Sequence, residues 1–339
     1  MDLEEKFALL KRNTQELVKE DELKEILKKK NPGAYIGFAP TGRIHIGYMI
    51  PLYKIRDFIA LGFKFTFLIA DLHAYLDDEK TPWELLDQRY EYYKLAITAL
   101  LKSFDVDTTK IEFVKGTDFQ FKRDYIINVF KMVGDVTLNR SKRAASEVVR
   151  FKEDPKLGGF IYPLLQIEDA KALQADVTFG GIDQRGIYML GRELLDAFGR
   201  EKYSCVFTPL LPGITGAKMS ASDPNSKIDI LDDEKTVIAK INKAQCVEGD
   251  SNNGVVAFCE YVLLPFLTDN GKSLRVERPE KFGGTVEYAS IAALKADFDA
   301  KKLHPADLKK AVAQEINLLL NPVRKTFEKH ADLIKRAYP

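Results

Sequence analysis

The chain has 339 residues, enough for two domains, and its 45% hydrophobic and 30% charged residues are typical of a globular protein in water. It has no apolar run of membrane-spanning length and no signal-peptide pattern at its start, so we expect a cytoplasmic protein. The net charge of +1 neither indicates nor excludes a nucleic-acid partner, because local basic patches are enough for one.

The first residues predict a helical arm over 1–32. Their charged, amphipathic pattern between 3 and 30 indicates two helices, with Thr14 as a candidate cap of the second. We expect this arm to pack over a larger domain.

Strands and helices alternate after the arm. We expect buried strands at 35–38, 63–70, 111–114, 177–179 and 204–207, and helices at 49–61, 83–103 and 187–198. This alternation is typical of a doubly wound parallel sheet of the Rossmann type.

Two regions depart from the alternation. The pattern of residues 116–173 predicts helices and is less regular. The chain from 229 onward is mostly helical, with a well-capped helix over 305–320. We therefore predict a Rossmann-like domain at 1–228 and an α-helical domain at 229–339.

A glycine-rich turn, Ala39-Pro40-Thr41-Gly42-Arg43-Ile44-His45-Ile46-Gly47-Tyr48, joins the first strand to its helix. Its glycines allow a ligand close to the backbone, at the amide end of the following helix. His45 could donate a hydrogen bond to a phosphate oxygen without carrying a full charge. Taken alone, the turn could equally be a structural corner.

A second stretch, Gly216-Ala217-Lys218-Met219-Ser220-Ala221-Ser222, offers one lysine and two serines to a triphosphate. The pair of motifs resembles the class I aminoacyl-tRNA synthetases. The segments 70–76, 162–169 and 179–185 resemble the tyrosyl-tRNA synthetases of archaeal and eukaryotic type, and the resemblance runs from about Lys11 to about Arg324.

The resemblance implies a ligase that activates L-tyrosine with ATP and Mg²⁺, releases pyrophosphate, and transfers tyrosine to the 3′ end of tRNA(Tyr). It implies a homodimer formed through the insertion at 116–173 and an anticodon-binding role for 229–339. No metal site or tightly bound cofactor is expected, and no protein nucleophile is required, because positioning and charge stabilisation can supply the catalysis.

By resemblance, the catalytic residues are His45, Lys218, Ser220 and Ser222. The implied ATP-binding residues are Gly37, Pro40, His45, Gly47, Tyr48, Asp183, Lys218 and Met219. Asp183 would accept hydrogen bonds from the ribose, and it could also cap the helix that follows. Tyr48 and Ala221 replace a histidine and a lysine of the wider class pattern, which places more of the chemistry on His45 and Lys218.

The resemblance implies a tyrosine pocket made of Tyr35, Tyr162, Gln166, Asp169, Gln184, His73 and Ala70. Tyr35 and Asp169 would bind the phenol, and Tyr162, Gln166 and Gln184 the α-amino group. Tyr162, Gln166 and Asp169 are spaced as one face of a helix, an arrangement that also fits a solvated stripe. Leu68, Phe119 and Gln120 would line the walls or belong to the core.

For tRNA, the resemblance places Arg185 near the first base pair of the acceptor stem and Phe282 and Asp307 at the anticodon. Phe282 could instead be a core aromatic residue and Asp307 a helix-start acid. The basic residues at 139–143 and 150–152 fit either a solvated helix face or contact with the acceptor end.

Three alternatives remain at this point. A tryptophan enzyme would share the fold and the phosphate motifs, but an indole offers only a donor to Tyr35 and Asp169. A catalytically silent paralogue would bind tRNA without adenylation, although His45, Lys218 and Gln184 are all present. An adenylyltransferase that does not act on tRNA is disfavoured by the length and the helical C-terminal region.

Overall fold

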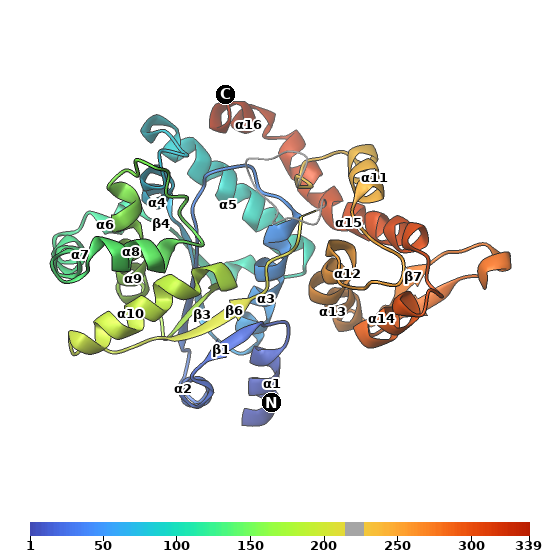
Figure 1. Ribbon diagram of the computed structural model, residues 1–339, viewed down its shortest axis with the longest axis horizontal. Helices are drawn as coiled ribbons and strands as arrows, with labels where there is room; N and C mark the ends of the chain where they lie inside the picture. The colour runs from blue at the N-terminus through green and yellow to red at the C-terminus, as the bar shows by residue number, and fades with distance from the viewer. Residues whose placement is uncertain (214–226) are drawn as a thin grey trace.

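The structure, a computed structural model, describes residues 1–213 and 227–339 and is built around a six-stranded sheet (Figure 1). The strand order is β1-β6-β5-β2-β3-β4, with β1 antiparallel to β6 and the other neighbours parallel. The strands are β1 (Glu16–Val18), β2 (Gly33–Phe38), β3 (Lys64–Ile69), β4 (Ile111–Lys115), β5 (Val177–Gly181) and β6 (Ser204–Thr208). The predicted Rossmann-like fold class is confirmed.

Helices cover the sheet, and helices also make up the insertion at 116–173. In the first part of the chain they are α1 (Leu3–Lys11), α2 (Glu20–Ile26), α3 (Met49–Ala60), α4 (Asp71–Leu76), α5 (Leu86–Ser103), α6 (Thr117–Gln120), α7 (Arg123–Asp135), α8 (Leu138–Ala145), α9 (Gly158–Ala172) and α10 (Arg185–Ala197). Short 3-10 turns precede α3, α5 and α10. Among the described residues, no helix combines the length and apolar composition that crossing a bilayer requires.

The C-terminal region is mostly helical, as expected. It contains α11 (Glu234–Lys243), α12 (Gly254–Phe258), α13 (Leu264–Asp269), the hairpin β7 (Leu274–Val276) and β8 (Val286–Tyr288), α14 (Ile291–Asp299), α15 (Pro305–Glu328) and α16 (Ala331–Ala337). Helix α15 runs past the predicted end at 320 and through Pro322. Burial of Val323 and Phe327 offsets the backbone hydrogen bond that the proline removes.

The central position of β2 determines where a ligand can bind. From β2 the chain proceeds through β3 to β4 on one side, and then returns to β5 on the other side. In open parallel sheets, ligands bind where the strand order reverses, beyond the carboxyl ends of the strands. That point lies between β2 and β5.

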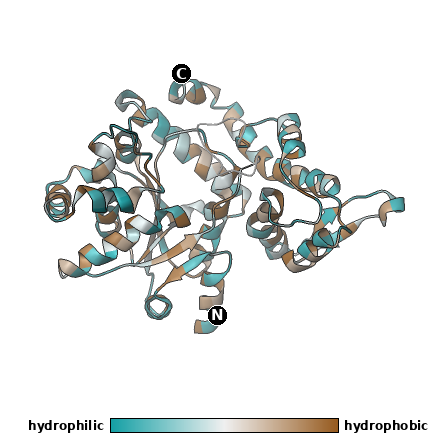
Figure 2. Ribbon diagram, viewed as in Figure 1, coloured by the Kyte–Doolittle hydropathy of each residue, from teal (hydrophilic) through white to brown (hydrophobic). Residues whose placement is uncertain are grey.

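One buried core joins the sheet to the C-terminal helices. Phe58 of α3 packs against Phe65 and Phe179, with ring centroids 5.4 and 5.0 Å apart. The same apolar cluster continues through α5 into α15 and α16, and Figure 2 shows apolar residues along the strands and in these helices. The domain boundary near 229 therefore stays a prediction, since the core is continuous across it.

The N-terminal arm differs from the prediction in two details. A short strand, β1, lies between its two helices and pairs with β6, and three residues are too few to show an alternating pattern. Thr14 does not cap α2: its hydroxyl donates to the Lys11 carbonyl (2.6 Å), and Lys19, in the left-handed conformation, precedes that helix.

A buried charge network holds the arm to the rest of the molecule. Lys54, on α3 and 1% exposed, donates to Asp57 (2.8 Å) and to the carbonyls of Leu9 and Arg12 (2.8 and 2.7 Å). Arg12 also pairs with Asp57 and, at 2.8 Å, with Asp269 at the end of α13. Burial lowers the pKa of Lys54 to about 8. The network thus joins the arm, the sheet domain and the C-terminal region.

We expect Asp57→Ala to lower the free energy of unfolding by about 3–5 kcal/mol, because it leaves Lys54 buried without its carboxylate. Urea denaturation of the variant measures this, with the exposed-pair variant Glu4→Ala as the control. A loss below about 1 kcal/mol would contradict the assignment of this network as a structural junction.

Candidate active site

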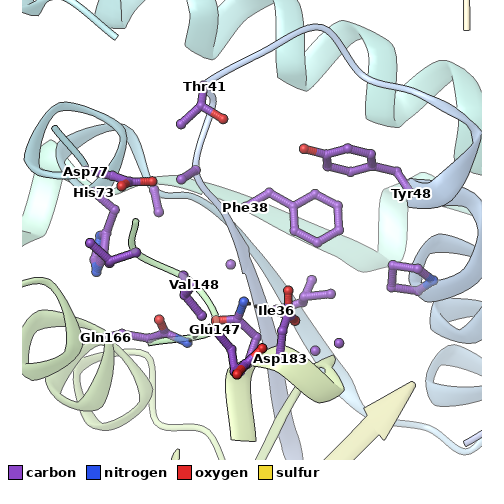
Figure 3. Close-up of a pocket in the computed structure, with 18 of the residues that line it drawn as sticks. Ile36, Phe38, Thr41, Tyr48, His73, Asp77, Glu147, Val148, Gln166 and Asp183 are labelled. Atoms are coloured by element: carbon purple, nitrogen blue, oxygen red, sulfur yellow. Dashed lines mark hydrogen bonds between the residues drawn. The ribbon is translucent and has the colours of Figure 1, made fainter. Parts of the chain in front are cut away.

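A cavity of about 1040 Å³ opens at the carboxyl edge of the sheet, between β2 and β5. Its walls come from the ends of these strands, the turn at 39–48, helix α9 and the loop that follows α8. In Figure 3, Gln166 and Asp183 lie on one side, with Thr41 and Tyr48 on the opposite side. Its volume is suitable for a small-molecule substrate.

The structure brings most of the predicted residues to this cavity. It is lined by Gly37, His45, Gly47, Tyr48 and Asp183 from the predicted ATP site, and by Tyr35, Ala70, His73, Tyr162, Gln166, Asp169 and Gln184 from the predicted tyrosine pocket. Leu68 also lines it. Pro40 instead is buried behind the turn, where its carbonyl accepts from the Thr81 hydroxyl (2.8 Å). Lys218, Met219, Ser220 and Ser222 lie outside the described residues.

Asp169 is the most unusual group in the cavity. It is 1% exposed, and its Oδ1 accepts hydrogen bonds from Gln120 (2.8 Å) and Tyr125 (2.7 Å). Within the described part of the chain, its Oδ2 has no hydrogen-bond partner, and neither has Nε2 of His73, 3.7 Å away. Burial raises the pKa of Asp169 to about 7, against the effect of the two hydrogen bonds. An oxygen in this state favours a ligand that donates a hydrogen bond.

Tyr35 supplies a hydroxyl group to the same end of the cavity as the Asp169 carboxylate. It donates to the Gln166 carbonyl (3.2 Å) and shares a hydrogen bond with the Tyr188 hydroxyl (3.0 Å). Burial raises the pKa of Tyr35 well above its ordinary value, so this hydroxyl stays protonated. Tyr188 was not predicted, although it lies one helical turn beyond Gln184 and that spacing could have identified it.

The polar stripe on α9 faces the cavity. Tyr162, Gln166 and Asp169 are all nine-tenths or more buried, so the stripe is not solvated. Gln166 donates to Gln184 (3.0 Å), and Gln184 donates to Asp183 (3.3 Å). Helix α10 has Gln184 at its N-cap position, and Asp183 lies within the preceding 3-10 turn. The stripe therefore continues from the phenol end toward the expected ribose end.

His45 is held neutral and in a defined tautomer. Its Nδ1 accepts a hydrogen bond from the Gly47 amide (3.2 Å), so the proton of the neutral ring lies on Nε2. Burial, and then the charge of Lys227, lower the pKa of His45 to about 3. Tyr48 packs edge-on against this ring (4.8 Å) and against Phe38 (5.0 Å). The ring can therefore act as a neutral donor.

The segment after residue 226 returns to the glycine-rich turn. Asp229 forms an ion pair with Arg43 (3.0 Å), and the backbone of Ile228 and Ile230 bonds to Ile46 and Ile44. Lys227 lines the cavity beside His45. Sequence reasoning missed Lys227 and Asp229, because the backbone pairing with the turn brings them to the site, and it assigned no role to Arg43 although Arg43 lies within the predicted turn.

The predicted tRNA residues lie away from the cavity. Arg185 is half-exposed and pairs with Glu16 (2.7 Å), and Asp307 lies in the first turn of α15. Phe282 is 61% exposed, so it is not a core residue, and the Lys281 ammonium lies 4.9 Å from its ring centroid.

Comparison with known proteins gives a consistent result. Residues 27–321 match the family model of the class I tRNA synthetases for tryptophan and tyrosine. A tyrosine–tRNA ligase of Haloarcula marismortui is 46% identical, over 100% of this chain and 98% of its own. The crystal structure of a tyrosyl-tRNA synthetase from Archaeoglobus fulgidus, complexed with L-tyrosine, is 42% identical with a TM-score of 0.89, over 96% of this chain and 99% of its own.

A eukaryotic relative has a comparable identity to this chain but is a longer protein. The cytoplasmic tyrosine–tRNA ligase of Danio rerio is 44% identical over 99% of this chain, which covers 63% of that protein. These matches extend over nearly the whole chain. The chain therefore belongs to the class I aminoacyl-tRNA synthetases and, within them, to the tyrosyl-tRNA synthetases.

Proposed function

We propose that this protein activates L-tyrosine with ATP, releases pyrophosphate, and transfers tyrosine to the 3′ end of tRNA(Tyr). The observation that carries the proposal is the buried Oδ2 of Asp169, which lacks a hydrogen-bond partner among the described residues and lies at the closed end of the cavity. A phenol hydroxyl would donate to this oxygen. Phenylalanine would leave it unpaired, and a pocket with an unpaired buried carboxylate oxygen therefore discriminates against phenylalanine.

Both ends of the amino acid have partners in the proposed pose. Tyr35 and Asp169 would bind the phenol, and His73 and Ala70 would line its pocket. Tyr162, Gln166 and Gln184 would hold the α-amino group. Gln166 and Gln184 already share a hydrogen bond (3.0 Å), so their side chains are oriented before the substrate enters. The amino-acid carboxylate would then lie toward the nucleotide.

Adenylation would use positioning and charge stabilisation. The carboxylate attacks the α-phosphorus, a P–O bond forms, and the bond to the leaving pyrophosphate breaks. His45 would donate from Nε2 to a phosphate oxygen, and Lys218, Ser220 and Ser222 would bind the β- and γ-phosphates. Gly37 and Gly47 would lie against the nucleotide and Asp183 would bind the ribose. We expect Mg²⁺ to enter with ATP, held mainly by its phosphates.

Gly37 supports the nucleotide position. A Cβ there would meet Leu68 and Tyr35 only at ordinary contact distances of 3.6 and 3.8 Å, so packing does not require glycine. The residue lines the cavity, and any side chain would project into it. The space left open is therefore available to a ligand.

The tRNA would bind across both parts of the chain. Phe282 follows β7 in the segment that projects from the molecule, with Gly283 and Gly284 at positive φ beside it (Figure 1). An exposed aromatic ring in this position can stack on an unpaired base. We assign Asp307 to the anticodon, Arg185 to the acceptor stem and the protein to the cytoplasm, the location in the name of its Danio rerio relative.

The insertion at 116–173 offers a surface for a second copy of the chain. Helix α7 buries Tyr125, Val129 and Met132 against its own fold. Its other face exposes Ile127, Phe130 and Val133 at helical spacing, followed by Leu138 at the start of α8. Phe130 is 66% exposed, and an apolar stripe of this kind favours a subunit interface. We include a homodimer in the proposal.

Tyrosine-dependent exchange of labelled pyrophosphate into ATP tests the function directly. We expect exchange with tyrosine and none with phenylalanine or tryptophan, followed by charging of tRNA(Tyr). Exchange with tryptophan instead would overturn the pocket assignment while leaving the family intact. Folded protein that exchanges with no amino acid would reject the proposed activity.

Asp169 should determine both affinity and pH dependence. Asp169→Asn is expected to lower kcat/KM for tyrosine about 10- to 150-fold, because a charge-assisted hydrogen bond is lost. In the wild type, kcat/KM should fall as the pH drops below about 7, since the carboxyl then gains the proton that blocks acceptance. The Asp169→Asn variant is the control for the wild-type pH profile. Its kcat/KM should not change with pH in this range, and a decline like that of the wild type would contradict the assignment.

We expect Phe130→Glu to convert the dimer to a monomer, because it places a charge in the apolar stripe. Sedimentation of the wild type and the variant measures the change. Phe282→Glu, an equally exposed aromatic position outside the insertion, is the control and should remain dimeric. A wild-type protein that sediments as a monomer would reject this interface.

A further inference from the structure

The glycine-rich turn is held in place through its backbone. The Thr81 hydroxyl donates to the Pro40 carbonyl (2.8 Å), and Arg89 donates to the carbonyl of Thr41. The Ile44 amide donates to the Tyr92 hydroxyl (3.3 Å). Each of these side chains lies on α5 or shortly before it, so this helix holds one side of the turn.

Gly42, within this turn, can be positioned only through its backbone, because it has no side chain to pack. Its carbonyl accepts hydrogen bonds from two phenols, Tyr93 (2.7 Å) and Tyr338 (2.9 Å). Tyr93 comes from α5, whereas Tyr338 follows α16, 296 positions along the chain.

Tyr338 is itself fixed by several contacts. The Arg89 guanidinium lies 4.6 Å from its ring centroid, and Arg89 Nε donates to the Ala337 carbonyl (3.0 Å). The Tyr92 ring packs edge-on against it at 5.1 Å. Arg89 therefore bonds the turn and the C-terminal segment at once, and Tyr338 lines the cavity beside Thr41 and Gly42.

We propose that Tyr338 is a positioning residue for nucleotide binding: through the Gly42 carbonyl it holds the turn in the shape that ATP requires. The inference rests on the proposed function, because it assigns the turn to ATP. It also means that the helical C-terminal region contributes directly to the affinity of the nucleotide site, separately from any contact with tRNA.

The position of Tyr338 distinguishes this role from packing alone. The Gly42 carbonyl has two lone pairs, and Tyr93 and Tyr338 each donate to it, so the Tyr338 hydroxyl restrains the turn in addition to the packing of its ring. The proposal therefore predicts that the hydroxyl matters while the ring stays in place. It also predicts an effect on ATP and not on tyrosine, because Gly42 belongs to the turn assigned to the nucleotide, whereas Asp169 belongs to helix α9 and the proposed tyrosine pocket.

The test uses Tyr338→Phe, which keeps the ring against Arg89 and Tyr92 and removes the bond to Gly42. The matched control is Tyr288→Phe, which removes a hydroxyl bond to Asp297 (3.1 Å) in the C-terminal region, far from the turn in the chain. We expect KM for ATP in pyrophosphate exchange to rise about two- to tenfold in Tyr338→Phe, the range for one hydrogen bond. KM for tyrosine should change less than twofold, and the control should match the wild type.

A second measurement separates this inference from the proposed function. Hydrogen exchange of the amides at 39–48, measured without substrates, should be faster in Tyr338→Phe than in the wild type and unchanged in Tyr288→Phe. Equilibrium dialysis with ATP alone should show the same loss of affinity. Failure of the wild type to exchange pyrophosphate would reject the activity, whereas these two measurements would still decide the role of Tyr338.

Two results would overturn the inference. One is unchanged amide exchange and ATP affinity in Tyr338→Phe. The other is an equal rise in KM for ATP and for tyrosine, since a general loosening of the cavity would affect both substrates.

Discussion

The turn from Pro40 to Ile46 has polar backbone groups that neither a helix nor a sheet satisfies, and much of the architecture meets that need. Buried amides and carbonyls must find partners, because leaving one unpaired is costly. Helix α5 bonds the turn on one side, and the segment at 228–230 bonds it on the other. Tyr338 adds a bond from the C-terminal region. The glycine-rich turn is thus the place where three distant parts of the chain meet.

The end of the cavity that contains Asp169 shows the opposite arrangement. There the fold leaves one oxygen of Asp169 without a partner among the described residues, while Gln120 and Tyr125 satisfy the other. Burial of the charged carboxyl is costly, and it raises the pKa of Asp169. A ligand that supplies the missing donor recovers that cost. The proposed selectivity for a phenol would follow from this unpaired oxygen.

Local patterns were enough to predict the sheet, whereas most cavity-lining residues were predicted from the family resemblance, with local spacing supporting only the stripe on one helix. The strands β2 and β3 are continuous apolar runs, and the stripe of Tyr162, Gln166 and Asp169 has helical spacing. Sequence reasoning failed where a partner is distant: β1 shows no pattern of its own, and Asp229 joins the site only by pairing with the turn. Tyr338 could not be found from local sequence for the same reason.

Helix α5 carries two sets of residues with different contacts along its length. Arg89, Tyr92 and Tyr93, near its beginning, bond the turn or the C-terminal segment, while Ile97, Leu100 and Leu101 are buried in the core. Adding or removing one residue between Tyr93 and Ile97 would rotate one set by about 100° relative to the other. The spacing between the two sets of residues on α5 is therefore fixed. Insertions and deletions are expected at the ends of this helix and not between the two sets.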